Sequence, residues 1–140
     1  MALSTIRRRL VALALAALLS AATLCTLNAC AGGGEPYQTI TSDEAAQMMQ
    51  EESIKFIVDV RTPEEYEAGH IPGAINIPVE SLGDEPPAML PATDELVMVY
   101  CRTGKRSAQA AQQLVDLGYT NVVDFGGIES WTGEIGRAHV

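Results

Sequence analysis

One apolar segment of the chain ends at a cysteine that is followed directly by a basic loop. Residues 96–100 are all apolar and have the pattern of a buried β-strand, and Cys101 comes next. Five residues follow that do not extend a strand, and residues 107–117 then have the pattern of a helix that Gly118 ends. Cys101 is therefore expected on a tight loop between the end of a strand and the start of a helix.

The expected loop surrounds the Cys101 thiol with hydrogen-bond donors and positive charge. Successive backbone N–H groups in such a loop form an anion nest, and the N-terminus of the following helix adds partial positive charge. Arg102, Lys105 and Arg106 add three cationic side chains within five positions. These features favour the nucleophilic thiolate. The alternative interpretation, a buried and inert cysteine, would not account for this concentration of basic residues.

The rest of the chain repeats the alternation of strand and helix. Thr41 with Glu44, and Thr62 with Glu65, have the spacing of a capping box, which marks a helix N-terminus. Residues 81–93 are Pro-rich and acidic and are expected to form a surface loop with one helical turn. This alternation indicates an α/β fold, with a parallel sheet that helices cover on both faces. We expect strands at 39–40, 54–60, 74–77, 96–100 and 121–125, and helices at 41–52, 62–69 and 107–117.

Three motifs resemble those of a known family. The loop from Cys101 to Ser107 resembles the active-site loop of single-domain rhodaneses, the thiosulfate sulfurtransferase-like proteins. Residues 59–78 and the sequence Gly-Gly-Ile-Glu-Ser-Trp at 126–131 resemble two further motifs, in the family's order and spacing. The resemblance implies a rhodanese-like domain at residues 39–132. It also implies a small, parallel, five-stranded sheet with helices on both faces and the active loop at its carboxyl edge.

The resemblance further implies sulfur transfer through a persulfide on Cys101, without a metal or other cofactor. Arg102 and Lys105 are expected to face an anionic sulfur donor, and Arg106 is expected to turn inward and fix the loop. Asp59 and Arg61 are expected to support the site by holding neighbouring loops together. The residues predicted to bind the donor or the persulfide are Arg102, Thr103, Gly104, Lys105, Arg106 and Ser107.

Several other functions fit the sequence less well. Four residues separate Cys101 from Arg106, whereas cysteine phosphatases have five, so a phosphatase or arsenate reductase is disfavoured. His70 precedes Ile-Pro-Gly and is interpreted as bracing a turn rather than as a base for Cys101. All eighteen acidic residues follow residue 34, and three of the nine basic residues precede residue 10, so the remaining chain is strongly acidic. That charge argues against nucleic-acid binding.

The N-terminal segment is predicted to be an export signal rather than part of the fold. Residues 7–9 are three arginines, an almost unbroken apolar run follows at 10–24, and Leu27-Asn28-Ala29-Cys30 resembles a lipobox, from which only Asn28 departs. We therefore expect a lipoprotein signal peptide at 1–29. An ordinary secretory signal, an uncleaved anchor and a twin-arginine signal are the alternatives.

Cleavage and acylation would leave a protein anchored to a bacterial membrane outside the cytoplasm. Residues 30–38 would be the lipidated Cys30 with its flexible tether, and residues 133–140 a frayed tail. Cys25 would leave with the signal, so Cys101 would be the free thiol of a monomeric mature protein.

Two functions remain open from the sequence. The first is a sulfurtransferase that takes sulfur from a small anionic donor and passes it to a thiol or cyanide. The second is a sulfur-carrier or protein-docking module at the cell envelope that does not turn over.

Overall fold

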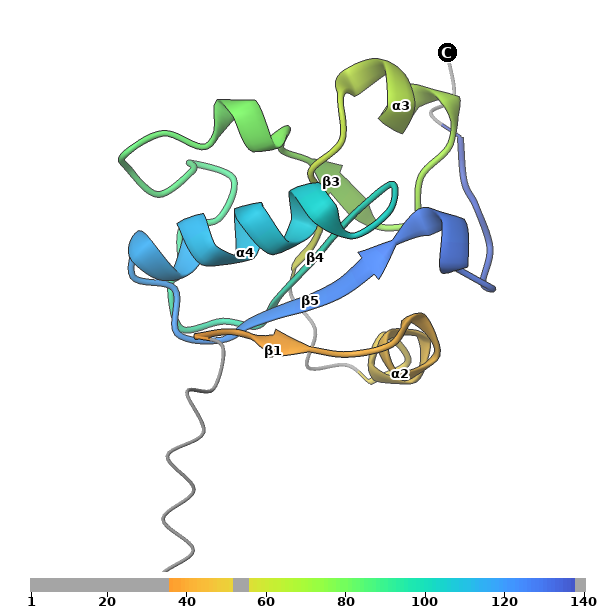
Figure 1. Cartoon of the computed structure of the whole chain (residues 1–140), viewed down its shortest axis with the longest axis horizontal. Helices are drawn as coiled ribbons and strands as arrows, with labels where there is room; N and C mark the ends of the chain where they lie inside the picture. The colour runs from red at the N-terminus through yellow and green to blue at the C-terminus, as the bar shows by residue number, and fades with distance from the viewer. Residues whose placement is uncertain (1–35, 52–55, 138–140) are drawn as a thin grey trace, which may run out of the picture. The chain divides into compact units, whose positions relative to one another are not determined.

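The computed structural model of the 140-residue chain describes residues 36–51 and 56–137 (Figure 1). The predicted signal peptide at 1–29 and the lipidation site Cys30 lie outside the described residues. Within the described ranges, every helix is too short or too polar to span a membrane.

The described residues form a five-stranded parallel sheet, as the sequence predicted. The strand order is β1-β5-β4-β2-β3, which places β4 in the centre (Figure 1). All of β4 is buried, which explains its unbroken apolar sequence, because a central parallel strand is covered on both faces. The strands are β1 Gln38–Thr39, β2 Phe56–Asp59, β3 Ala74–Asn76, β4 Val97–Cys101 and β5 Val122–Gly127.

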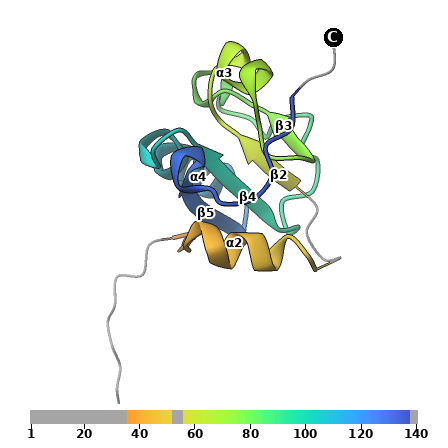
Figure 2. The same ribbon diagram turned by 90° about the vertical axis from the view of Figure 1, so that its right-hand side faces the viewer.

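Helices cover both faces of this sheet (Figure 2). On one face, α4 packs Ala110 and Leu114 against the valines of β2 and β4. On the other face, α2 packs Ala45 beside Met98 and Phe125. The helices are α2 Ser42–Met48, α3 Pro63–Ala68 and α4 Lys105–Asp116, with single 3-10 turns η1 Val79–Ser81 and η2 Ile128–Ser130.

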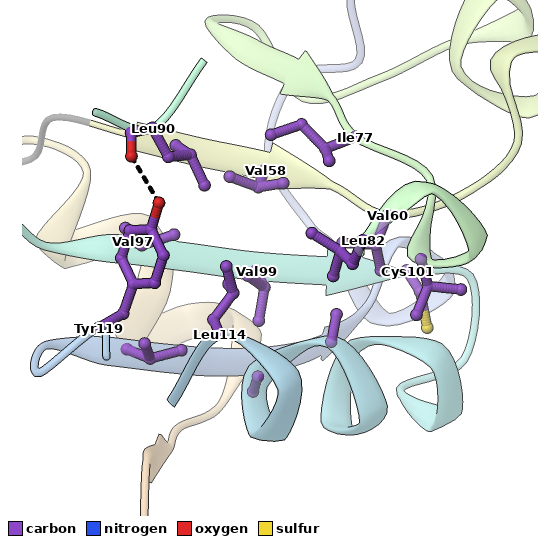
Figure 3. Close-up of a cluster of buried hydrophobic side chains, with 14 residues drawn as sticks. Val58, Val60, Ile77, Leu82, Leu90, Val97, Val99, Cys101, Leu114 and Tyr119 are labelled. Carbon is purple, nitrogen blue, oxygen red and sulfur yellow. Dashed lines mark hydrogen bonds between the residues drawn. The ribbon is translucent and has the colours of Figure 1, made fainter. Parts of the chain in front are cut away.

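The core on the α4 face extends along β4 toward the cysteine (Figure 3). Val97 and Val99 of β4 pack with Leu114 of α4 and Tyr119, and Cys101 belongs to the same buried cluster. Tyr119 donates its hydroxyl to the carbonyl oxygen of Leu90, which holds the Pro-rich loop against the core. The core thereby fixes the strand end from which the reactive loop departs.

Three boundaries within the described residues differ from the sequence prediction by two residues or more, and the others by at most one. Helix α4 begins at Lys105, two residues before the predicted start, because Gly104 takes the N-cap position with a backbone φ of 101°. Helix α2 ends at Met48, although the pattern predicted a helix to residue 52. Strand β5 continues through Gly127, where the sequence predicted a tight turn at Gly126-Gly127.

The C-terminal segment also differs from the predicted frayed tail. Gly136 pairs with His70 through two backbone hydrogen bonds of 2.9 and 2.8 Å. Trp131 donates its indole N–H to the carbonyl oxygen of Glu134 at 3.1 Å. These contacts tie the segment as far as Gly136 to the turn that follows α3.

Candidate active site

Cys101 is the last residue of β4 and lies next to the start of α4. Its side chain is buried, with 1% of the residue exposed, and it forms no disulfide. Figure 3 shows the sulfur at the carboxyl end of β4, beside the N-terminal part of α4. The predicted strand–loop–helix position of the thiol is therefore confirmed.

The loop directs a backbone donor at the sulfur. The N–H of Gly104 donates a hydrogen bond to Cys101 Sγ at 3.0 Å. Gly104 can aim its N–H this way because its φ of 101° lies in the region that glycine adopts without strain. A donor at this distance stabilises negative charge on sulfur, and the N-terminus of α4 acts in the same direction.

Gly127 lets β5 pass directly against the loop. It pairs with Cys101 across a register irregularity between Val99 and Cys101. A Cβ at Gly127 would overlap the carbonyl oxygen of Arg102 and lie 2.7 Å from Thr103 Cα. The sequence predicted a turn at this glycine but not its close approach to the loop, because the contact joins residues far apart in the chain.

Ser107 links the loop, α4 and β5. The residue is fully buried, and its hydroxyl lies 3.0 Å from the carbonyl oxygen of Gly104 and 3.2 Å from that of Gly126. Gly104, whose N–H donates to Cys101, is thus held through its own carbonyl oxygen. Ser107 contributes to the geometry of the site from beneath the loop.

Two of the three loop cations are paired with glutamates. Arg102 is exposed and lies 3.2 Å from Glu129. Arg106 donates two hydrogen bonds to Glu65, of 2.6 and 2.9 Å, which join α4 to α3. These hydrogen bonds lower the pKa of Glu65 to about 2. Lys105 is exposed, and no ion pair of the described residues includes it.

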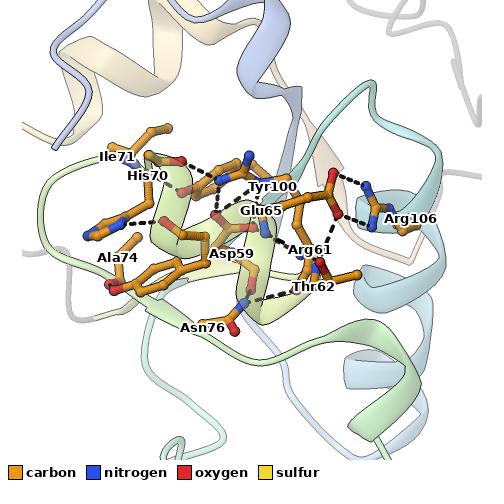
Figure 4. A network of polar contacts seen from close by, with 12 residues as sticks. Asp59, Arg61, Thr62, Glu65, His70, Ile71, Ala74, Asn76, Tyr100 and Arg106 are labelled. Carbon is orange, nitrogen blue, oxygen red and sulfur yellow. Dashed lines mark hydrogen bonds and ion pairs between the residues drawn. The ribbon is translucent and has the colours of Figure 1, made fainter. Parts of the chain in front are cut away.

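Asp59 and Arg61 form a buried ion pair at the end of β2 (Figure 4). Arg61 Nη2 lies 2.6 Å from Asp59 Oδ2 and donates a second bond to the carbonyl oxygen of Gly69 at 2.7 Å. Asn76 of β3 donates to the carbonyl oxygens of both Asp59 and Arg61. This network joins the carboxyl ends of β2 and β3 to the end of α3.

His70 contacts the end of α3 and the C-terminal segment. Its Nδ1 lies 2.9 Å from the carbonyl oxygen of Tyr66, and its ring stacks on the Tyr66 ring at a centroid distance of 3.8 Å. Its backbone pairs with Gly136. These contacts brace the turn after α3, which is the role that the sequence favoured for His70.

The described residues contain no group of three or more His, Cys, Asp or Glu side chains arranged to hold a metal ion. What the geometry offers is a buried thiol with a backbone donor at its sulfur, beneath the N-terminus of a helix. Such an arrangement suits covalent chemistry on sulfur.

The family model for the rhodanese-like domain matches residues 41–134 of the chain. The chain belongs to the rhodanese-like domain family. Its five-stranded parallel sheet with helices on both faces agrees with that membership. The crystal structure of a rhodanese-like domain protein from Staphylococcus aureus superposes with a TM-score of 0.64 and 32% identity, covering 73% of this chain and 99% of that one.

Relatives of this rhodanese-like domain carry sulfurtransferase names. Thiosulfate sulfurtransferase PspE of Escherichia coli is 40% identical over 72 residues, 51% of this chain and 69% of the relative. A sulfurtransferase of Allochromatium vinosum is 37% identical over 93 residues, 66% of this chain and 85% of the relative. An adenylyltransferase and sulfurtransferase of Ogataea parapolymorpha is 32% identical over 106 residues, and the chain spans 27% of its length. These similarities support sulfur transfer as the general class of chemistry.

Proposed function

We propose that the protein is a sulfurtransferase that moves sulfane sulfur from a donor such as thiosulfate to a thiophilic acceptor. The observation that carries the proposal is the hydrogen bond of 3.0 Å from the Gly104 N–H to Cys101 Sγ, at the end of a buried strand. This donor supports both a thiolate and the persulfide anion that follows it. A merely structural buried cysteine needs no such donor.

In the first half-reaction, the Cys101 thiolate attacks the outer sulfur of thiosulfate. A sulfur–sulfur bond forms on Cys101, the sulfur–sulfur bond of thiosulfate breaks, and sulfite leaves with the bonding electron pair. The charge of the thiolate moves to the terminal sulfur of the persulfide. Backbone N–H groups of the loop would hold that anion as an oxyanion hole holds oxygen. Arg102 and Lys105 would attract the incoming donor.

In the second half-reaction, the acceptor attacks the terminal sulfur of the persulfide. With cyanide as the acceptor, the product would be thiocyanate. The electron pair of the broken sulfur–sulfur bond would return to Cys101, which becomes a thiolate again. The short spacing of four residues between Cys101 and Arg106 suits a single sulfur atom better than a tetrahedral phosphate. Covalent catalysis in two steps requires the donor product to leave before the acceptor reacts.

Steady-state kinetics with thiosulfate and cyanide test this mechanism. We expect parallel lines in double-reciprocal plots, the signature of a ping-pong mechanism, and loss of turnover in Cys101→Ser. Ser81→Ala, at the exposed end of η1, is a control expected to match the wild-type protein. Intersecting lines, or turnover in Cys101→Ser equal to that of the wild type, would contradict the proposed persulfide.

We also propose that Cys30 is acylated and anchors the protein outside the cytoplasm. The support is the sequence alone: an arginine cluster, an apolar run and a lipobox-like segment before a glycine-rich tether. Cys30→Ser is expected to shift the protein from the membrane fraction to a soluble fraction, since the lipid would be missing. Equal membrane association of both forms would contradict lipid anchoring at this residue.

A further inference from the structure

Asp124 is a buried carboxyl group behind the reactive loop. It lies on β5, paired in register with Val99 of β4 and Thr39 of β1, and 4% of the residue is exposed. None of the ion pairs among the described residues includes it. Burying a carboxylate without a cation costs stability, so an acidic residue at this position requires an explanation.

A chain of hydrogen bonds connects the Asp124 carboxyl to the sulfur of Cys101 through Gly126, Ser107 and Gly104. Its Oδ1 accepts a hydrogen bond of 2.9 Å from the N–H of Gly126. Burial raises the pKa of the Asp124 carboxyl, and the hydrogen bond from the Gly126 N–H partly offsets that rise. The Ser107 hydroxyl lies 3.0 Å from the carbonyl oxygen of Gly104, whose N–H donates to Cys101 Sγ.

We propose that Asp124, in its ionised form, is a positioning residue for Cys101. The carboxylate holds the N–H of Gly126, whose carbonyl oxygen lies 3.2 Å from the Ser107 hydroxyl. That hydroxyl also lies 3.0 Å from the carbonyl oxygen of Gly104, so this chain of contacts keeps the Gly104 N–H directed at the sulfur. The consequence for catalysis rests on the proposed sulfur transfer. The consequence for the reactivity of the thiol does not.

Other ionisable groups lie on the elements next to β5. Strand β4 contributes the thiol of Cys101, and the segment before β1 contributes the phenol of Tyr37. The first turn of α4 carries exposed Lys105, together with Arg106, which is bound to Glu65. From η2, Glu129 is paired with Arg102 at the surface. A titration between pH 3 and 7 that disappears in Asp124→Asn would therefore belong to Asp124.

Asp124→Asn separates a positioning role from a structural one. The amide keeps the shape and one acceptor oxygen but cannot carry charge. Below the unfolded pKa of aspartate, the proton on a buried carboxyl stabilises the fold, and this stabilisation is lost as pH rises through the raised native pKa. We therefore expect Asp124→Asn to melt at the same temperature as the wild type or higher at pH 7, and this advantage to disappear at acid pH.

The reactivity of the thiol is expected to change in the opposite direction. Reaction of Cys101 with 2,2′-dithiodipyridine, followed by release of the pyridine thione, should be about fivefold slower in Asp124→Asn at pH 7. The reason is that a charge-assisted contact supporting the Gly104 donor is lost. The ratio of the two rates should approach one as pH falls, because protonated Asp124 also lacks the charge. Asp116→Asn, which removes an exposed carboxylate at the end of α4, should leave both rate and stability unchanged.

A double-mutant cycle with Ser107→Ala tests the route of the effect. Because both residues act through Gly104, their effects on the thiol rate should not add. An Asp124→Asn protein with the wild-type thiol rate, with additive effects, or with lower stability at pH 7 would overturn the inference. If the wild type takes no sulfur from thiosulfate while Asp124→Asn still slows the thiol reaction, the proposed function fails and the positioning role stands.

Discussion

At Gly127, the absence of a side chain decides whether the reactive loop can form. The backbone of Arg102 and Thr103 occupies the space that a Cβ would need. Relief would require movement of either the loop or β5, and both are anchored through Ser107. The reactivity of Cys101 therefore depends on a residue that carries no chemistry of its own.

Gly127→Ala is expected to lose most sulfur-transfer activity and to lower the free energy of unfolding by about 1–3 kcal/mol, because overpacking moves a buried backbone. Gly83→Ala is the matched control, since a Cβ there meets nothing within 4 Å. Thermal unfolding and the thiosulfate–cyanide assay measure both effects. Wild-type stability and turnover in Gly127→Ala would show that the loop does not need this close approach.

At the scale of elements, Glu65 joins α3 to the start of α4. Its Oε2 accepts from the backbone N–H of Thr62, as the capping box predicts, and also from Arg106. The same carboxylate thus caps the start of α3 and holds α4 in place. A shift of α4 would move Gly104, so this pair also supports the position of the donor to Cys101.

Glu65→Gln is expected to lower the free energy of unfolding by about 1 kcal/mol at pH 7, since both side chains of the pair are 28% exposed and solvent screens it. The pKa of Glu65 is lowered to about 2, so its contribution is present above its ordinary pKa and lost as pH falls toward 2. The stability difference from the wild type should disappear in the same range. Denaturant unfolding as a function of pH measures it.

Glu67→Gln, on the exposed side of the same helix, is the control and should stay close to the wild type at each pH. If Glu67→Gln is as destabilising as Glu65→Gln, the loss comes from helix charge and the Arg106 pair contributes little.

The sequence predicted those elements whose signals are local. The capping boxes at Thr41 and Thr62 mark helix starts because the cap and its partner lie three residues apart, and both are present. The start of α4 was missed because Gly104 provides no side-chain cap. Its position depends on backbone conformation rather than on a recognisable residue pattern.

The partners of the site residues were not predictable, because they lie far apart in the chain. Glu65 and Arg106 are 41 positions apart, and Glu65 was already explained by its cap. Asp124 is one polar residue within the predicted strand at 121–125, and only the register of β5 beside β4 shows that it lies behind the loop. The cysteine itself was predictable, since its strand, loop and helix are consecutive.

At the scale of the whole molecule, the site gathers at the carboxyl ends of adjacent parallel strands. Cys101 ends β4, Asp59 ends β2, and Gly127 ends β5. Ligands of open α/β sheets bind at this edge. The basic loop is a local exception on an acidic chain of net charge −9, which suits a small anion at one point.

The proposed mechanism requires Cys101 to carry sulfur as a persulfide. The most direct measurement is the intact mass of the purified protein after incubation with thiosulfate and removal of excess donor, with Cys101→Ser treated in parallel. We expect a gain of one sulfur atom, located at Cys101, that cyanide removes with formation of thiocyanate. An unchanged mass with thiosulfate and with other sulfane donors, or the same gain in Cys101→Ser, would contradict the proposed persulfide on Cys101.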